Sequence, residues 1–134
     1  MMIGMFGRRR APLTGAPANP RQKTYSAQSG YVYQYFYLGQ RAGKRDRQPG
    51  TEYVFDVSAD RKSSFPVSVF VGDPALQAWE HRWSRLLQAN ERYAIAKMAL
   101  FQAFDERSTP AEMRLELRVR EADVQLILGL LGIQ

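Results

Sequence analysis

The chain has 134 residues, of which 45% are hydrophobic and 24% charged, so its size and composition suit one globular domain. It contains no cysteine, which excludes disulfide bonds, thiolate metal ligands and a thiol nucleophile. The formal net charge is +6, and most of it lies in the first 23 residues, which hold five basic side chains and no acid.

The first part of the chain differs from the rest in composition. Residues 1–24 are rich in proline and glycine and show no hydrophobic periodicity. Such a segment buries too little apolar area to offset its ordering entropy. We therefore expect a disordered basic N-terminal arm over residues 1–24 and a single α+β domain over residues 25–134.

Several features favour a cytoplasmic location. No apolar run approaches the roughly 20 residues that a membrane-spanning helix needs. The apolar residues at the N-terminus precede the arginines, whereas a secretory signal has its charges first. The lack of cysteine also argues against a small secreted scaffold.

Three strands are predicted in the first half of the domain. Residues 31–38 are mostly aromatic or β-branched, and a period of two places four tyrosines on one face. Residues 39–50 are polar and bounded by glycines, which predicts a loop. Residues 51–58 and 65–71 alternate again, so we expect an antiparallel meander.

Two helices are predicted next. Asp73 is a suitable N-cap with Pro74 at the first helical position, and apolar residues then recur at helical spacing. Trp79 and Trp83, four residues apart, would lie one above the other on the face that packs on the sheet. Asn90 is expected to cap a second helix that runs to about residue 107.

The C-terminal quarter combines two patterns. Residues 109–112 match a capping box, whereas apolar and charged residues alternate strictly from 113 to 119. Those apolar residues would scatter round a helix but share one face of a strand, so we expect a helical turn and then a fourth strand. Residues 122–131 predict an apolar terminal helix, either buried or at an interface.

These elements predict the order βββααβα. The expected fold is α+β, with a mainly antiparallel sheet of three to four strands and two to three helices packed on one face. The other face is expected to be partly open.

The tyrosine row and the basic segments are the candidate binding features. The tyrosines can form a platform that stacks nucleic-acid bases, or they can simply cover a half-exposed sheet face. The basic side chains suit nucleic acid first, or an acidic protein surface, although basic tails and turns are also common solubilising features. The candidate binding residues are Arg8, Arg9, Arg10, Tyr31, Tyr33, Tyr35, Tyr37, Arg41, Lys44, Arg45 and Arg47.

No catalytic, metal or cofactor site is predicted. His81 is the single histidine and is expected to face the side of its helix or solvent. Glu52, Asp56 and Asp60 are interpreted as an exposed polar face, and the serines 58, 63 and 64 have no neighbouring base.

The prediction is therefore a non-enzymatic binding or adaptor module that engages an anionic partner through the basic arm and the 41–47 loop. The alternative is a structural or protein-interaction subunit, in which the tyrosine face or the C-terminal helix forms an oligomer or partner interface. An enzyme ranks third, because no acid–base pair or activated nucleophile can be named.

Overall fold

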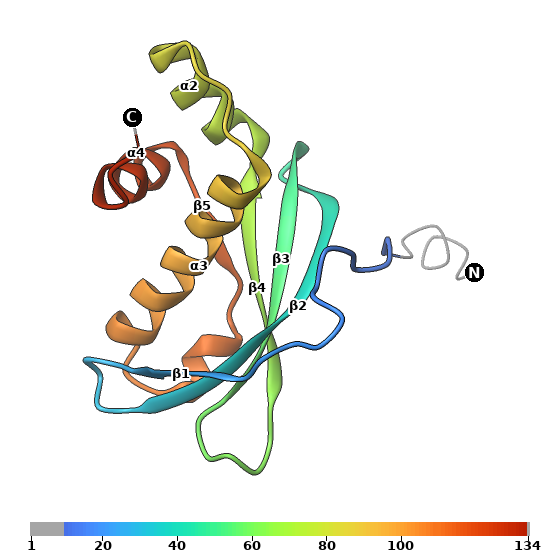
Figure 1. Cartoon of the computed structure of the whole chain (residues 1–134). Helices are drawn as coiled ribbons and strands as arrows, with labels where there is room; N and C mark the ends of the chain where they lie inside the picture. Colours follow the sequence, from blue (N-terminus) through green and yellow to red (C-terminus); the bar gives the residue numbers. More distant parts are fainter. Residues whose placement is uncertain (1–9, 134) are drawn as a thin grey trace.

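A five-stranded sheet carries helices on one side, as the computed structural model of residues 10–133 shows (Figure 1). The strands lie in the sheet in chain order: β1 (Lys23–Ser26), β2 (Val32–Arg45), β3 (Gln48–Ser58), β4 (Phe65–Gly72) and β5 (Leu117–Val119). The helices are α2 (Asp73–Trp83), α3 (Ala89–Glu106) and α4 (Glu121–Leu130), and a 3-10 turn, η1 (Pro110–Arg114), precedes β5.

The sheet is mixed. The strands β1 to β4 form an antiparallel meander, whereas β5 lies parallel to β4. A parallel neighbour needs a long crossover, which α2, α3 and η1 supply. The predicted α+β class is confirmed, but the predicted mainly antiparallel sheet of three to four strands is corrected to a mixed sheet of five.

The core lies between the sheet and the helices, on what we call the helix face of the sheet. The period of two brings Tyr33, Tyr35 and Phe55 to this face, and all three are buried. The ring of Phe104 from α3 stacks on that of Tyr33, with centroids 4.2 Å apart. Alanines on α3 let the helix approach the strands closely.

The segment 39–50, predicted as a loop, is strand almost throughout, so that prediction was wrong. Arg45 pairs with Gln48, and only Asp46 and Arg47 form the turn. Both have positive φ, 52° and 68°, as a type I′ hairpin turn requires. The polar side chains do not break the strands, because they pair with charges on neighbouring strands.

A β-bulge changes which side chains share a face. The register of β2 against β3 shifts between Tyr37 and Gly39. Beyond this point the odd-numbered residues of β2 point away from the helices. Arg41 and Arg45 therefore lie on the opposite side of the sheet from Tyr37, on what we call the charged face.

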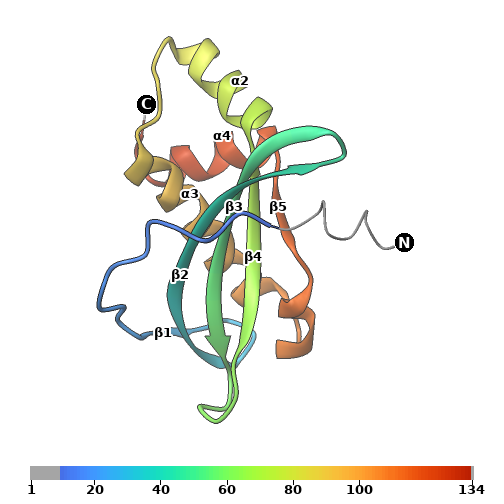
Figure 2. The same cartoon turned by 90° about the vertical axis from the view of Figure 1, so that its right-hand side faces the viewer.

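The N-terminal segment runs beside the sheet. Thr14 and Gln40 exchange backbone hydrogen bonds of 2.8 and 2.9 Å. Gly39 faces this contact, since a Cβ there would lie 2.9 Å from the carbonyl oxygen of Thr14. Figure 2 shows the segment crossing the charged face before it reaches β1. We call residues 14–22 the strap.

The flexibility predicted for residues 1–24 stays a prediction, and Arg8 and Arg9 lie outside the described residues.

The C-terminal region confirms the predicted turn followed by a strand, with differences in detail. The strand is β5, shorter than the predicted 113–119, and Leu115 is exposed because it lies between η1 and β5. The helices α2 and α3 begin slightly earlier than expected, with Gly72 and Gln88 as N-caps. In the part of the chain that the structure describes, no helix has the length and apolar character that crossing a membrane requires.

Candidate functional site

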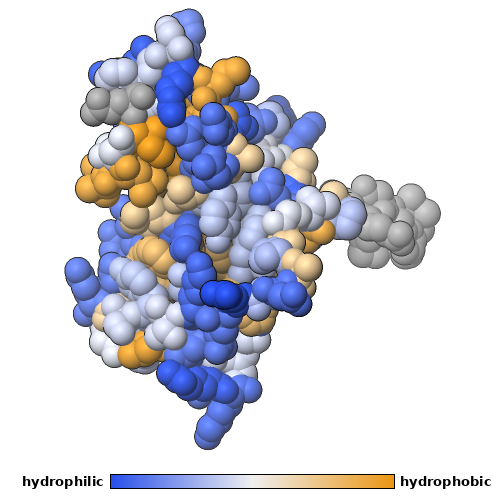
Figure 3. All heavy atoms as spheres, in the orientation of Figure 1, coloured by the Kyte–Doolittle hydropathy of each residue, from blue (hydrophilic) through white to orange (hydrophobic). Residues whose placement is uncertain are grey.

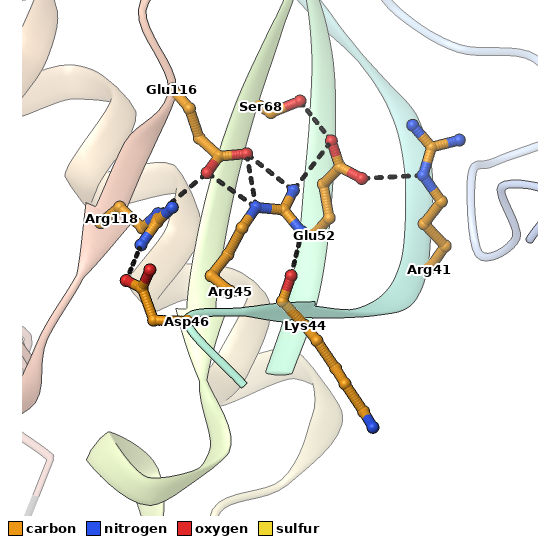
Figure 4. Close-up of polar contacts among 8 residues, drawn as sticks. All are labelled: Arg41, Lys44, Arg45, Asp46, Glu52, Ser68, Glu116 and Arg118. Atoms are coloured by element: carbon orange, nitrogen blue, oxygen red, sulfur yellow. Dashed lines mark hydrogen bonds and ion pairs between the residues drawn. The ribbon is translucent and has the colours of Figure 1, made fainter. Parts of the chain in front are cut away.

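Two arginines of the hairpin, Arg41 and Arg45, are bound within the protein by carboxylates (Figure 4). Arg41 Nε donates to Glu52 Oε1 at 2.8 Å, and Ser68 Oγ donates to the other oxygen of the same carboxylate. Glu52 is only 4% exposed, so the expectation that it belongs to an exposed polar face is corrected. It is buried because β2, β4 and the N-terminal segment surround it with partners.

The same network continues to β5. Arg45 forms a two-point contact with Glu116, at 2.9 and 2.7 Å, and Arg118 bridges Glu116 and Asp46. Positive and negative groups therefore alternate across the charged face. We call this set the charge ladder; its members are Arg41, Glu52, Arg45, Glu116, Arg118 and Asp46.

The electrostatics of the charge ladder hold the carboxylates of Glu52 and Glu116 ionised. Burial raises the pKa of Glu52, but the hydrogen bonds from Arg41 and Ser68 outweigh it, and the pKa ends below its usual value. For Glu116, burial is likewise outweighed by the hydrogen bonds from Arg45 and Arg118. Arg41 and Arg45 thus neutralise Glu52 and Glu116, and their guanidinium groups are engaged within the protein.

Three of the other basic candidates, which lie in the described part of the chain, are free of such pairing. Lys44, Arg47 and Arg10 are exposed, and none of them has an ion pair within residues 10–133. Arg10 lies close enough to Glu52 to contribute to its lowered pKa. What these residues bind stays a prediction.

The tyrosine row belongs to the core over most of its length. Tyr33 and Tyr35 are 0% and 5% exposed beneath α3, Tyr37 is half-buried, and Tyr31 at the start of the row is 38% exposed. The helix face is the covered side of the sheet, so the rings of Tyr33 and Tyr35 offer no open platform on which bases could stack. Their burial fits the simpler interpretation, in which the tyrosines cover a face of the sheet.

A cavity of about 690 Å³ lies between the strap, β2 and α3. The strap forms its outer wall, because residues 15–22 leave the edge of β2 between the Thr14–Gln40 pair and β1. Tyr35, Phe36 and Tyr37 contribute from β2, and the first turn of α3 contributes Ala89, Asn90 and Tyr93. We call this space the strap cavity.

The charged side chains that line the strap cavity are all positive. Arg21 and Lys23 line it, and none of the described residues that line it is acidic. Lys97 of α3 lies beside Lys23, close enough for the charge of Lys23 to lower the pKa of Lys97, in addition to the larger effect of burial. The strap cavity therefore combines partly apolar walls with uncompensated positive charge.

Among the remaining polar candidates, Asp60 has a structural role and His81 has none that the structure shows. His81 is exposed, as expected. Asp60 accepts the backbone N–H groups of Ser63 and Lys62, which lowers its pKa to about 2 and fixes the turn between β3 and β4. Across residues 10–133, no three His, Cys, Asp or Glu side chains converge in a way that could hold a metal ion.

An apolar patch lies on α4. Val124, Ile127 and Leu128 are buried, whereas Leu126 and Leu130 point outward and are 61% and 64% exposed. Figure 3 shows apolar side chains gathered over this helix. One side of the terminal helix is thus buried, as one of the two expectations held, and an interface on its exposed side stays a prediction.

Sequence reasoning missed the strap cavity. Its outer wall is a proline-rich stretch without periodicity, and only the excess of positive charge in that stretch pointed to it. Comparison of this chain with known protein families, with curated proteins and with solved structures gives no match. The function must therefore be argued from the geometry alone.

Proposed function

We propose that this protein is a non-enzymatic binding module that receives an anionic ligand in the strap cavity. The main support is the charge of the cavity, where Arg21 and Lys23 are not balanced by any acidic lining residue. In a partly enclosed site the effective dielectric is lower than in water, so unpaired cations attract an anion more strongly there. The basic N-terminal segment, and not the hairpin, then supplies the preference for anions.

The size of the strap cavity favours a small ligand. Its volume of about 690 Å³ lies within the range of cavities that enclose small molecules. A nucleic-acid strand, the first partner suggested by the sequence, has less support, because Arg41 and Arg45 are ion-paired and Tyr33 and Tyr35 are buried.

Two matched dyes test the proposal on the full chain. Anilinonaphthalene sulfonate is anionic, and N-phenylnaphthylamine has the same rings without the charge. The anionic dye should bind about tenfold more tightly, and replacing both Arg21 and Lys23 by glutamine should remove this advantage, since each unpaired cation contributes up to roughly 1 kcal/mol. Fluorescence titration measures both affinities.

The control changes the same number of charges at the hairpin, with Lys44→Gln and Arg47→Gln together. It should leave both dye affinities unchanged. Equal binding of the two dyes, or equal loss in both double variants, would contradict an anion site at the strap cavity. Tight, salt-dependent binding of a labelled single-stranded oligonucleotide that survives Arg21→Gln with Lys23→Gln would place the anionic partner elsewhere.

Self-association is a second candidate function, favoured by the exposed leucines of α4. Leu126 and Leu130 lie on the same side of the helix, four residues apart, with most of their surface in solvent. Burying such side chains against a second copy would remove apolar area from water.

Light scattering tests this second candidate. The wild-type chain should form a dimer at high concentration, and Leu126→Lys should shift it to a monomer without loss of stability, because the side chain is exposed. A wild-type chain that stays monomeric at every concentration would rule this candidate out. The variant His81→Lys, on the exposed side of α2, provides a control for added charge.

A further inference from the structure

The hydrogen-bonding groups of the strap cavity narrow the class of anion, an inference that rests on the proposed function. Tyr37 Oη donates to Gln40 Oε1 at 2.9 Å, which leaves the amide nitrogen of Gln40 as its free group. The rings of Tyr37 and Tyr93 lie 4.8 Å apart. Burial and then the neighbouring phenols Tyr53 and Tyr93 raise the pKa of Tyr37, so its hydroxyl stays protonated. The amide nitrogen of Gln40 and the cationic side chains of Arg21 and Lys23 therefore remain as donors to a ligand, and an acceptor-rich ligand suits the cavity.

Lys23, which lines the cavity, has a second lysine as its neighbour. Lys23 lies on β1 and Lys97 on α3, and their ammonium groups are close enough to repel each other. Neither forms an ion pair with a carboxylate of residues 10–133. A carboxylate bound against this pair would offset the repulsion between the two ammonium groups.

The first turn of α3 does not offer a backbone site for a phosphate group. Glu91 accepts the backbone N–H of Gln88 at 2.9 Å and pairs with Arg85 at 2.7 Å. The positive end of the helix macrodipole therefore already holds a carboxylate, next to the cavity residue Asn90. The backbone N–H groups with which a helix N-terminus commonly binds a phosphate are therefore already capped within the protein, whereas a carboxylate at Lys23 does not need them.

The walls of the strap cavity favour a ligand whose uncharged part is apolar. Pro17 and Pro20 of the strap face the cavity together with Phe36 and the tyrosine rings, and these groups offer no charge to a ligand. We infer that the ligand is an organic carboxylate of single negative charge, with its carboxylate at Lys23 and an apolar body between the strap prolines and the rings of Tyr37 and Tyr93.

Three naphthalene ligands of similar size test this inference by calorimetric titration of the full chain. They are 1-naphthoate, 1-naphthyl phosphate and the neutral 1-naphthalenemethanol. We expect 1-naphthoate to bind about tenfold more tightly than each of the other two. Lys23→Gln should remove most of the advantage of 1-naphthoate over the alcohol, whereas Lys44→Gln, a matched loss of charge at the hairpin, should leave it unchanged.

The outcomes separate the inference from the proposed function. If 1-naphthyl phosphate binds more tightly than 1-naphthoate and Lys23→Gln weakens it, the cavity binds anions but the carboxylate class is wrong. If the alcohol binds as well as 1-naphthoate, the cavity is an apolar site and both the inference and the proposed function are overturned. Absence of binding by all three ligands overturns both as well.

Discussion

Replacing Glu52 by alanine is expected to lower the free energy of unfolding by about 3 kcal/mol, at the low end of the range for breaking a buried ion pair. The side chain of Glu52 is 5% exposed and lies within ion-pair distance of both Arg41 and Arg45, at 2.8 and 3.8 Å. Without it, the two guanidinium groups remain together on the charged face, and the hydroxyl of Ser68 loses its acceptor. Urea denaturation followed by circular dichroism measures the change.

Glu116→Ala is the matched control on the same face. Its side chain is 27% exposed, so water can solvate Arg45 once the carboxylate is removed. We expect a loss of about 1 kcal/mol, typical of a partly exposed hydrogen-bonded pair. Equal losses of unfolding free energy in the two variants would show that the effect of Glu52→Ala does not depend on the burial of Glu52.

The pH dependence of stability gives an independent check on Glu52. Its pKa in the folded protein is below the value of about 4.3 that a glutamate has in an unfolded chain. Its contribution is therefore complete above that unfolded value and is lost as the pH falls through the folded pKa. The stability gap between the wild type and Glu52→Gln should close over the same acidic range, because a protonated glutamate resembles glutamine.

Gly50→Ala is expected to cost about 3 kcal/mol or more, at the upper end of what overpacking of a core site causes. A Cβ at Gly50 would lie 2.5 Å from the carbonyl oxygen of Val71 and 2.5 Å from the ring of Phe70. The first contact involves the backbone of β4, which cannot move without breaking its pairing with β3. Thermal and urea denaturation should both show the loss.

The glycine directly opposite provides the control. Gly43 pairs with Gly50 across the hairpin, and a Cβ there would lie 3.3 Å from the end of the flexible Arg45 side chain. Gly43→Ala should change the stability by less than about 1 kcal/mol, since removing a glycine from a strand offsets part of the crowding. If Gly50→Ala lowers the stability no more than Gly43→Ala does, β3 and β4 can move apart at this point to accommodate the added methyl group.

The elements with strong periodicity were predictable from the sequence. The alternation in 31–38, 51–58 and 65–71 placed the three central strands, and the helical spacing placed α2, α3 and α4. These patterns are local and depend on one apolar face meeting the core. The short edge strand β1 has no such face, and its pairing with residues 32–35 of β2 was not visible in the sequence.

The hairpin shows why a polar segment can be misassigned. Composition alone predicted a loop for 39–50, since glycines and charges are rare in central strands. A two-residue turn at Asp46 and Arg47 would have placed Arg41 opposite Glu52 and paired the two glycines. This pairing of opposite charges and of glycines about the turn is present in the sequence, but it can be recognised only once the position of the turn is assumed.

The candidate site was only partly accessible to sequence reasoning. The excess of basic residues before residue 24 was noted, and Arg21 and Lys23 belong to it. Their neighbours Tyr93 and Lys97 come from α3, about seventy residues further along the chain. The cavity is a product of tertiary packing, so no local pattern marks it.

The N-terminal segment also determines how the sheet ends. The outermost strands are short, four residues in β1 and three in β5, while β2 has 14 residues, of which 32–35 pair with β1 and Gln40 pairs with Thr14 on the outer side. A chain shortened to begin after β1 would keep every helix but leave this long strand with unpaired backbone groups. Such an edge is a template for strands of other molecules. The segment that walls the strap cavity therefore also covers part of a sheet edge that would otherwise be open to pairing with a second molecule.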